Sequence, residues 1–256
     1  MSDVLLTVKN IHKSFGGLIA INALSFQVKK NEIFAIIGPN GAGKTTLFNI
    51  LTGFITTDNG EIQFENKTLH HEKPDVISRS GIARTFQNIR LFNALTVLDN
   101  VIVALDAHSQ TFYLSALLHT TAFKKEEKKH REQAMQLLQV VGLEKQADRM
   151  AATLSYGDQR HLEIARALGL HPKLLLLDEP AAGANGSEKI ALKQLIKDIQ
   201  QQFALTILLI EHDMPLVMDI ADHIIVLDYG TLIAQGTPQQ IQNNPRVIEA
   251  YLGKSD

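Results

Sequence analysis

A glycine-rich stretch at residues 38–45 constrains this chain more than any other feature of its sequence. It reads Gly-Pro-Asn-Gly-Ala-Gly-Lys-Thr and satisfies the phosphate-binding pattern Gly-x4-Gly-Lys-Ser/Thr, between an apolar run typical of a buried strand and a segment typical of a helix. Gly41 and Gly43 let the backbone curl so that its N–H groups face a phosphate, toward which the helix directs its positive N-terminal end. Lys44 is then placed to reach the β and γ phosphates, and the Thr45 hydroxyl to bind Mg²⁺.

An ordinary strand-to-helix turn is the alternative, but such a turn does not require every position of the pattern to be filled in this context. The sequence therefore predicts a nucleoside triphosphate site on this segment, which we call the phosphate loop (residues 38–46). Its predicted members are Gly38, Pro39, Asn40, Gly41, Ala42, Gly43, Lys44, Thr45 and Thr46.

A second motif supplies carboxylates. Four leucines at residues 174–177 predict a strand buried on both faces, and Asp178 and Glu179 follow it directly. The C-terminal ends of parallel strands meet at the ligand-binding edge of a sheet, so Asp178 is predicted to hold Mg²⁺ through water and Glu179 to polarise an attacking water. Two acids could also merely solvate a strand end, but the phosphate loop in the same chain favours the functional interpretation.

Composition limits the size, partners and location that this chain can have. The chain has 256 residues, 45% of them hydrophobic, which fits one large α/β domain or two small ones. A formal net charge of −2 indicates no nucleic-acid surface, and the lack of cysteine excludes disulfides and thiolate metal sites. Residues 1–10 show no secretory signal, and no window approaches the ~18 apolar residues of a membrane span. We therefore expect a soluble chain that acts on membranes only through partners.

The pattern along the chain predicts two kinds of strand. Residues 5–8, 24–28 and 61–64 alternate apolar and polar residues, as antiparallel strands with one exposed face do. The apolar runs at residues 33–37, 174–177 and 206–210 predict strands of a buried parallel sheet, each followed by a helix.

The middle and the end of the chain differ from this pattern. From about residue 88 to 167 the periodicity is helical, which predicts a helical subdomain inserted into the α/β core, with the charge run at 124–131 on a solvated helix face. Residues 223–227 and 231–234 predict a terminal hairpin, and a short helix is expected around residues 245–252.

Three further elements narrow the kind of nucleoside triphosphatase. Residues 154–160 read Leu-Ser-Tyr-Gly-Asp-Gln-Arg before a predicted helix, Gln87 lies between the two motifs, and His212 follows the next buried strand. Gln87 and His212 alone would be unremarkable polar residues. In this order the chain, from about residue 5 to 252, resembles the ABC ATPases, with their signature segment (residues 154–160 here), Q-loop and switch histidine. A kinase would not need the signature, and the Asn-Lys-x-Asp of a GTPase is not found.

The resemblance implies an ABC ATPase fold within a single domain (residues 1–256): a P-loop NTPase core, an antiparallel β subdomain and the inserted helical subdomain. It implies a head-to-tail dimer with two ATPs at the interface, each contacting the phosphate loop of one copy and Ser155, Tyr156, Gly157 and Asp158 of the other. It further implies that Phe15 stacks on adenine, for which a core phenylalanine is the equal alternative. The catalytic residues it implies are Glu179, His212 and Gln87, and those near the metal are Thr45, Gln87 and Asp178.

One branch of the family matches in more detail. Residues 84–92, Tyr156 in the signature, residues 179–183 and the ending at 236–253 resemble the larger ATPase of branched-chain amino acid importers. The lipopolysaccharide-transport ATPase shares much of the ending and is the main alternative. A non-transport ABC ATPase is another, although such proteins usually have two fused cassettes or a long coiled coil.

The implied cofactors are ATP and Mg²⁺. The implied partners are two membrane permease subunits, a second ABC ATPase that is identical or paralogous, and indirectly a periplasmic or extracellular binding protein, but no nucleic acid. The implied location is cytoplasmic, peripheral on the inner face of the cell membrane.

Two residues depart from the family pattern. Asp158 stands where the signature usually has Gln, a change that we expect to leave the site active. Gly186 follows Asn185 where relatives usually have Pro, which predicts a looser turn after Glu179 and an altered coupling between the two ATP sites.

Overall fold

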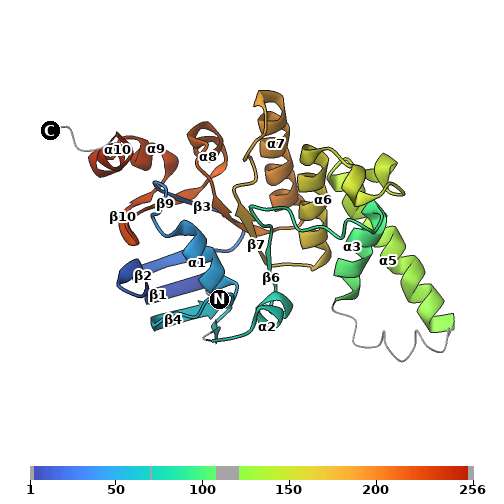
Figure 1. Cartoon of the computed structure of the whole chain (residues 1–256), viewed down its shortest axis with the longest axis horizontal. Helices are drawn as coiled ribbons and strands as arrows, with labels where there is room; N and C mark the ends of the chain where they lie inside the picture. The colour runs from blue at the N-terminus through green and yellow to red at the C-terminus, as the bar shows by residue number, and fades with distance from the viewer. Residues whose placement is uncertain (1–2, 70, 108–120, 253–256) are drawn as a thin grey trace.

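The main sheet of the chain has six strands and is mostly parallel (Figure 1). A computed structural model describes residues 3–69, 71–107 and 121–252. The strand order is β10 (Thr231–Gly236), β9 (His223–Asp228), β3 (Ile33–Ile37), β8 (Thr206–Ile210), β7 (Leu174–Asp178) and β6 (Ile82–Arg84). Strands β9 to β6 run parallel and β10 pairs with β9 antiparallel. The predicted buried parallel strands and the terminal hairpin are confirmed.

Strand β6 was not predicted. Its three residues are too few to show any periodicity, and they become a strand only by pairing with β7, with Ile82 opposite Leu174. The strand matters because the chain that leaves it reaches Gln87 three residues later.

The second sheet is antiparallel, with the order β2 (Leu18–Lys29), β1 (Val4–Phe15), β4 (Asn59–Phe64) and β5 (Lys67–Thr68). Strands β1 and β2 extend well beyond the predicted segments. The register shifts between Val8 and Ile11, where Asn10 has a positive φ of 47°. Such a bulge interrupts the two-residue alternation, so the sequence pattern revealed only part of each strand.

Helices cover the main sheet on both faces. Alternate residues of the strands, such as Phe34 and Leu176, pack with α1 (Lys44–Leu51) and the antiparallel sheet. The intervening residues, such as Leu175, pack against α7 (Gly186–Gln202) and α8 (Met214–Ile220). This double coverage explains why β3, β7 and β8 are buried along their whole length.

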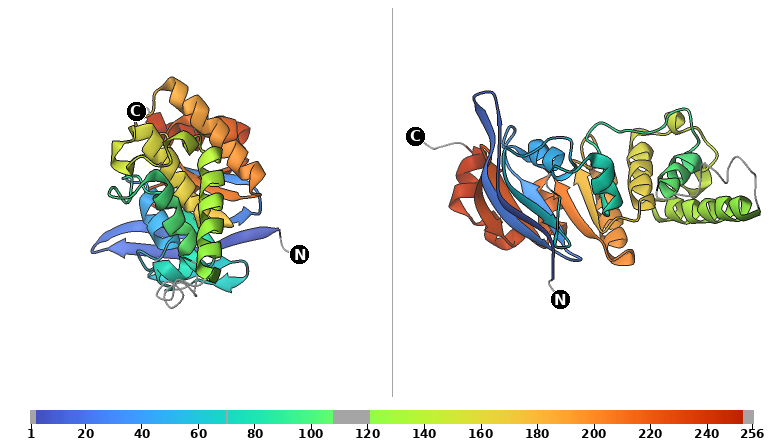
Figure 2. Two further views of the ribbon diagram at one scale, coloured as in Figure 1. Left: turned by 90° about the vertical axis from the view of Figure 1, so that its right-hand side faces the viewer. Right: turned by 90° about the horizontal axis from the view of Figure 1, so that it is seen from below.

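The middle of the chain is helical, as predicted. Helices α3 (Val97–Asp106), α5 (Thr121–Val140) and α6 (Tyr156–Gly169) form the end of the molecule beyond α7 (Figures 1 and 2). Short 3₁₀ helices at Glu144–Gln146 and Ala151–Thr153 lead into α6. In the described parts of residues 88–167 the only β pairing is a bridge between Thr96 and Met150. Residues 108–120 lie outside the description.

The charge run at 124–131 lies on α5, where the described side chains from 125 onward are exposed or half-buried, so the solvated-face prediction is confirmed. The side chain of Lys124 is outside the description.

Among the described residues, three helices remain. Helix α2 (Pro74–Arg79) precedes β6, and α9 (Pro238–Gln242) and the expected α10 (Pro245–Leu252) follow β10. Residue 253 of the family-like ending lies outside the description. Within residues 3–69, 71–107 and 121–252, no helix combines the length and apolarity needed to cross a bilayer.

Candidate nucleotide-binding site

The strand order brings the predicted site residues to one edge of the main sheet. Strand β8 lies between β3 and β7, and all three run in the same direction. Their C-terminal ends are therefore neighbours: the phosphate loop follows β3, His212 follows β8, and Glu179 follows β7. Residues from distant parts of the sequence thus meet where parallel sheets bind ligands.

Glycine is required in the phosphate loop for two physical reasons. Gly41 and Gly43 have φ of 80° and 96°, as the predicted curl of the backbone requires. Close approach is the second reason. A Cβ at Gly38 would lie 2.1 Å from the carbonyl oxygen of Leu227, and one at Gly43 would lie 2.5 Å from that of Ala20. No sequence pattern indicates these contacts, because the neighbouring atoms belong to strands β9 and β2.

Lys44 begins helix α1 and its side chain turns back toward the loop. The residue is 7% exposed, and its Nζ donates hydrogen bonds to the carbonyl oxygens of Gly38 at 2.7 Å and Pro39 at 2.9 Å. Burial lowers the pKa of Lys44, while the charges of Glu179 and Asp178 oppose that shift. The next residue, Thr45, is exposed, so its hydroxyl is open to a ligand.

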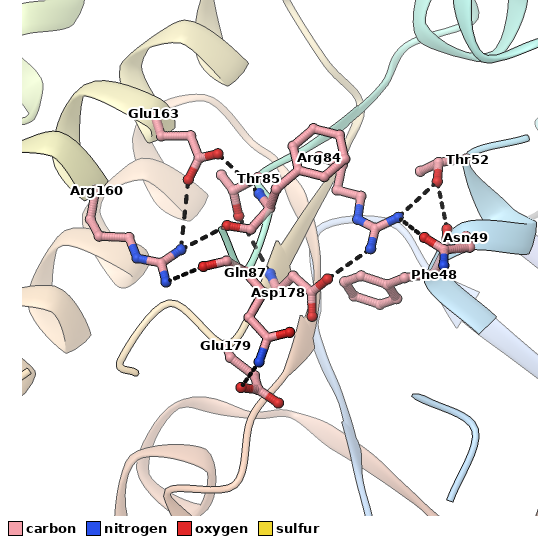
Figure 3. A network of polar contacts seen from close by, with 11 residues as sticks. Phe48, Asn49, Thr52, Arg84, Thr85, Gln87, Arg160, Glu163, Asp178 and Glu179 are labelled. Atoms are coloured by element: carbon pink, nitrogen blue, oxygen red, sulfur yellow. Dashed lines mark hydrogen bonds and ion pairs between the residues drawn. The ribbon is translucent and has the colours of Figure 1, made fainter. Parts of the chain in front are cut away.

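Asp178 is buried and its carboxylate pairs with Arg84. The Arg84 Nη2 to Asp178 Oδ2 distance is 2.7 Å, and both side chains are at least nine-tenths buried. Arg84 also donates to Asn49 Oδ1 and Thr52 Oγ1 of the α1 region at 2.8 and 3.1 Å (Figure 3). This partner was missed by the sequence reasoning, and its only signal was an arginine three residues before Gln87.

The structure brings together Glu179, Gln87 and His212, the three residues expected to be catalytic. Gln87 Nε2 donates to Glu179 Oε2 at 3.0 Å (Figure 3), and His212 Nδ1 lies 3.9 Å from the same oxygen. Glu179 has a φ of 49°, a conformation costly for a residue other than glycine. The hydrogen bond from its N–H to Ile210 O at 2.9 Å helps to hold that backbone.

A second missed residue, Glu211, fixes the turns that carry this cluster. The residue is 1% exposed, and its carboxylate accepts hydrogen bonds from the N–H groups of Ala181, His212 and Asp213 at 2.7, 3.0 and 3.2 Å. It therefore ties the turn after β7 to the turn after β8. Its position beside His212 was the only signal in the sequence.

The signature segment opens helix α6 in the helical part of the chain. Ser155 is the N-cap, and its Oγ accepts from Asp158 N at 3.1 Å. The Asp158 carboxylate accepts from Gln146 Nε2 at 3.2 Å, and Tyr156 is 51% exposed. Among the residues the structure describes, 155–158 share no hydrogen bond or ion pair with the phosphate loop. The structure thus does not bring these two predicted parts of the site together within one copy.

Phe15 lies at the end of β1 and is 46% exposed, with Lys13 Nζ 5.4 Å from the centre of its ring. The alternative that Phe15 is a core phenylalanine is therefore wrong.

The turn at Gly186 is held by neighbouring side chains. Asn185 and Glu188 form a capping box at the start of α7, with hydrogen bonds of 2.9 and 3.0 Å, and Ser187 Oγ donates to Asn185 at 2.7 Å. These bonds constrain the N-terminal turn of α7 that glycine alone would loosen.

The residues at this edge suit a magnesium ion. Magnesium prefers oxygen ligands and keeps several waters or phosphate oxygens. Thr45 is exposed and offers a hydroxyl oxygen. In the described structure, Gln87 bonds to Glu179 through Nε2 and Asp178 accepts a side-chain hydrogen bond on Oδ2, which leaves Gln87 Oε1 and Asp178 Oδ1 for a metal. No cluster of three or more His, Cys, Asp or Glu residues that could hold a metal by itself occurs in the described ranges. This donor set fits an ion held largely by a bound triphosphate.

The family model described as ABC transporter matches residues 21–182, and one described as branched-chain amino acid ATP-binding cassette transporter matches residues 231–256. The structure superposes on the ADP form of an ATP-binding cassette of an ABC transporter with a TM-score of 0.85, at 33% identity and over 99% of this chain and 100% of that one. The chain therefore belongs to the ABC transporter family, and it is an ABC ATPase.

Two relatives resemble the chain over its full length. It is 46% identical to the high-affinity branched-chain amino acid transport ATP-binding protein BraF of Pseudomonas aeruginosa, and 47% identical to LivG of Salmonella typhimurium, a protein of the same description. Both alignments run over 255 residues and cover 100% of each chain.

Proposed function

We propose that this chain energises the uptake of branched-chain amino acids by hydrolysing ATP on behalf of separate membrane permeases. The observation that carries the proposal is the end-to-end similarity to BraF and LivG at 46% and 47% identity. The match of residues 231–256 to the family model described as branched-chain amino acid ATP-binding cassette transporter supports the same branch. Both observations favour amino acid import over the lipopolysaccharide-transport and non-transport alternatives.

The proposed chemistry uses the cluster at the sheet edge. Glu179 orients and polarises the attacking water, with Gln87 and His212 within 4 Å of its Oε2. Lys44 and the N–H groups of the phosphate loop hold the triphosphate, which supplies oxygen acceptors in place of the loop carbonyls. When bound, Mg²⁺ would be held by Thr45, Gln87 and Asp178 and would neutralise phosphate charge. Phe15, exposed at the end of β1, is the proposed platform for adenine.

The signature residues are proposed to act on the nucleotide of a second cassette. Ser155, Tyr156, Gly157 and Asp158 lie at the N-terminal end of α6, where free N–H groups attract an anion. Since the described structure shows no hydrogen bond or ion pair between them and the phosphate loop of their own chain, a head-to-tail dimer supplies the missing half of each site. The second cassette is another copy or a paralogue.

The remaining partners follow from the same proposal. Two permease subunits would dock this chain at the inner face of the cell membrane, and a binding protein would deliver the amino acid from outside. We further propose that residues 1–256 are a single ABC domain in which the helical segment of about 88–167 is an inserted subdomain that transmits motion to the permeases.

The test is reconstitution of the tagged chain with the membrane proteins that purify with it. Proteoliposomes that contain the complex and the binding protein should take up labelled leucine, isoleucine and valine only with ATP, and a complex carrying Glu179→Gln should not. ATP-dependent movement of lipopolysaccharide instead, or hydrolysis without any amino acid uptake, would contradict the proposal.

A further inference from the structure

The backbone that carries Gln87 is held by side chains of a single helix. Up to Thr85 the chain belongs to the sheet, with Thr85 N donating to Leu176 O at 2.9 Å. From residue 86 to residue 90, no backbone group has a backbone hydrogen-bond partner within the described structure. Backbone polar groups that leave a sheet need other partners, and here α6 provides them for Phe86, Gln87 and Arg90.

Three residues of α6 make these bonds. Arg160 donates from Nη1 to Phe86 O at 2.8 Å and from Nη2 to Gln87 O at 2.7 Å (Figure 3). Glu163 Oε1 accepts from Phe86 N at 3.0 Å and from Arg90 N at 3.4 Å. Arg166 donates to the carbonyl oxygen of Arg90. Because positions three apart lie on the same side of a helix, these residues form one continuous clamp face.

The charged residues of this clamp face are buried and therefore depend on their backbone partners. Arg160 and Glu163 are 5% and 4% exposed, with 3.7 Å between Arg160 Nη1 and Glu163 Oε2. Burial raises the pKa of Glu163, while the N–H groups of Phe86 and Arg90 and the charge of Arg160 oppose that shift. A buried ion pair is tolerated best where its remaining polar atoms are hydrogen-bonded. Here the backbone of residues 86–90 serves Nη1 and Nη2 of Arg160 and Oε1 of Glu163, whereas Arg160 Nε and Glu163 Oε2 have no hydrogen-bond partner in the described structure. Displacing that backbone would leave charged groups without partners.

The clamp face also contacts Tyr156, at the start of the signature helix. The Nη2 of Arg160 donates to Tyr156 Oη at 2.8 Å, and the guanidinium lies 5.3 Å from the centre of the Tyr156 ring. The guanidinium of Arg160 therefore binds both the backbone of Gln87 and the exposed tyrosine of the signature. The side chain of Gln87 in turn contacts Glu179.

We infer that Arg160 is a positioning residue that fixes Gln87 relative to the first turn of α6. A movement of Arg160 would then change both the contact of Gln87 with Glu179 and the position of Tyr156. Because Glu179 acts on the nucleotide of this chain and Tyr156 on that of the neighbouring copy, Arg160 couples the two nucleotide sites. Only the roles of Glu179 and Tyr156 rest on the proposed function. The planar fork of arginine is needed to reach both carbonyls, because lysine offers a single point charge.

The test compares Arg160→Lys with Arg131→Lys, a control on the exposed surface of α5. Each is measured in the parental chain and in a Gln87→Ala chain, for turnover and for ATP affinity. Arg160→Lys should lower kcat by about 10-fold to 100-fold with an unchanged ATP affinity. It should have no further effect in the Gln87→Ala chain, because its action passes through Gln87. Equal losses in both backgrounds would indicate a merely structural role and overturn the inference.

Hydrogen exchange separates this inference from the proposed function. In the nucleotide-free chain, Arg160→Lys should speed amide exchange at residues 86–90 by on the order of tenfold, with the rest of α6 and the Arg131→Lys protein unchanged. This measurement needs no ATP hydrolysis. A parental chain without ATPase activity would reject the proposed function, whereas unchanged exchange at 86–90 would reject the positioning role.

Discussion

The side-chain amide of Gln87 donates a hydrogen bond to Glu179 at 3.0 Å, although 92 positions of sequence separate the two residues. Parallel pairing of β6 with β7 produces this contact, because Arg84 lies opposite Leu176 and each chain then leaves the same edge of the sheet. The carboxylate at the end of β7 is thus held by a residue whose own backbone is anchored on α6.

Replacing Glu179 with Gln tests its assignment as the general base. The amide keeps the size of the side chain and removes its charge, so ATP binding should persist while turnover falls by about 10²–10⁴-fold. Steady-state hydrolysis and a nucleotide titration measure the two effects. Glu127→Gln, on the exposed part of α5, is the matched control. A near-parental rate for the Glu179 variant would show that another group is the base.

Lys44→Ala tests the phosphate loop. It removes the cation that donates to the loop carbonyls and faces Asp178 and Glu179. A hydrogen bond to a charged group contributes ~1.5–3 kcal/mol, so ATP affinity should fall roughly 10-fold to 100-fold, and hydrolysis should fall with it. Circular dichroism should be unchanged, as should the ATP affinity of Lys128→Ala, whose side chain is 80% exposed. Unchanged binding by a folded Lys44→Ala protein would refute the assignment.

The buried pair of Arg84 and Asp178 predicts a large effect on stability. Arg84→Met would leave a buried carboxylate without its cation, which typically costs about 3–5 kcal/mol. The control is Arg79→Met, which breaks an exposed pair with Asp75 that is 3.7 Å long and contributes about 0–1 kcal/mol. Urea unfolding measures both free energies. Similar values for the two variants would mean that the buried pair adds no more than a surface pair.

A cross-link between copies tests whether the signature acts in trans. The chain has no cysteine, so engineered thiols would be the only ones present. Asn40 and Ser155 are exposed and suitable, whereas Ala42 and Leu154 are buried. Differently tagged copies carrying Asn40→Cys and Ser155→Cys, both with Glu179→Gln, should form a cross-linked heterodimer only with ATP, since a disulfide needs Cα atoms within ~7 Å. Equal cross-linking without nucleotide would contradict the ATP-dependent interface, and no cross-link at all would indicate a paralogous partner.

Local patterns predicted most of the elements and indicated many of the candidate site residues. The phosphate loop, the strand before Asp178 and the start of α6 at Tyr156 each depend on neighbours in sequence, so each was predictable. Strand β6 and the full length of β1 were not. A three-residue strand exists only through its partner, and a bulge at Asn10 hides the alternation that a pattern search needs.

The sequence by itself determined which chemical groups this protein has: the glycines and lysine of the phosphate loop, the carboxylates after a buried strand, and the glutamine, histidine and signature in family order. Only the tertiary structure decided their contacts. It placed β8 between β3 and β7 and paired Arg84 with Asp178. It also bonded the N–H of His212 to the Glu211 carboxylate and the carbonyl oxygen of Gln87 to Arg160. Backbone conformation and short motifs are encoded by adjacent residues, whereas these contacts arise from strand pairing and burial between segments far apart in the chain, which no local pattern records.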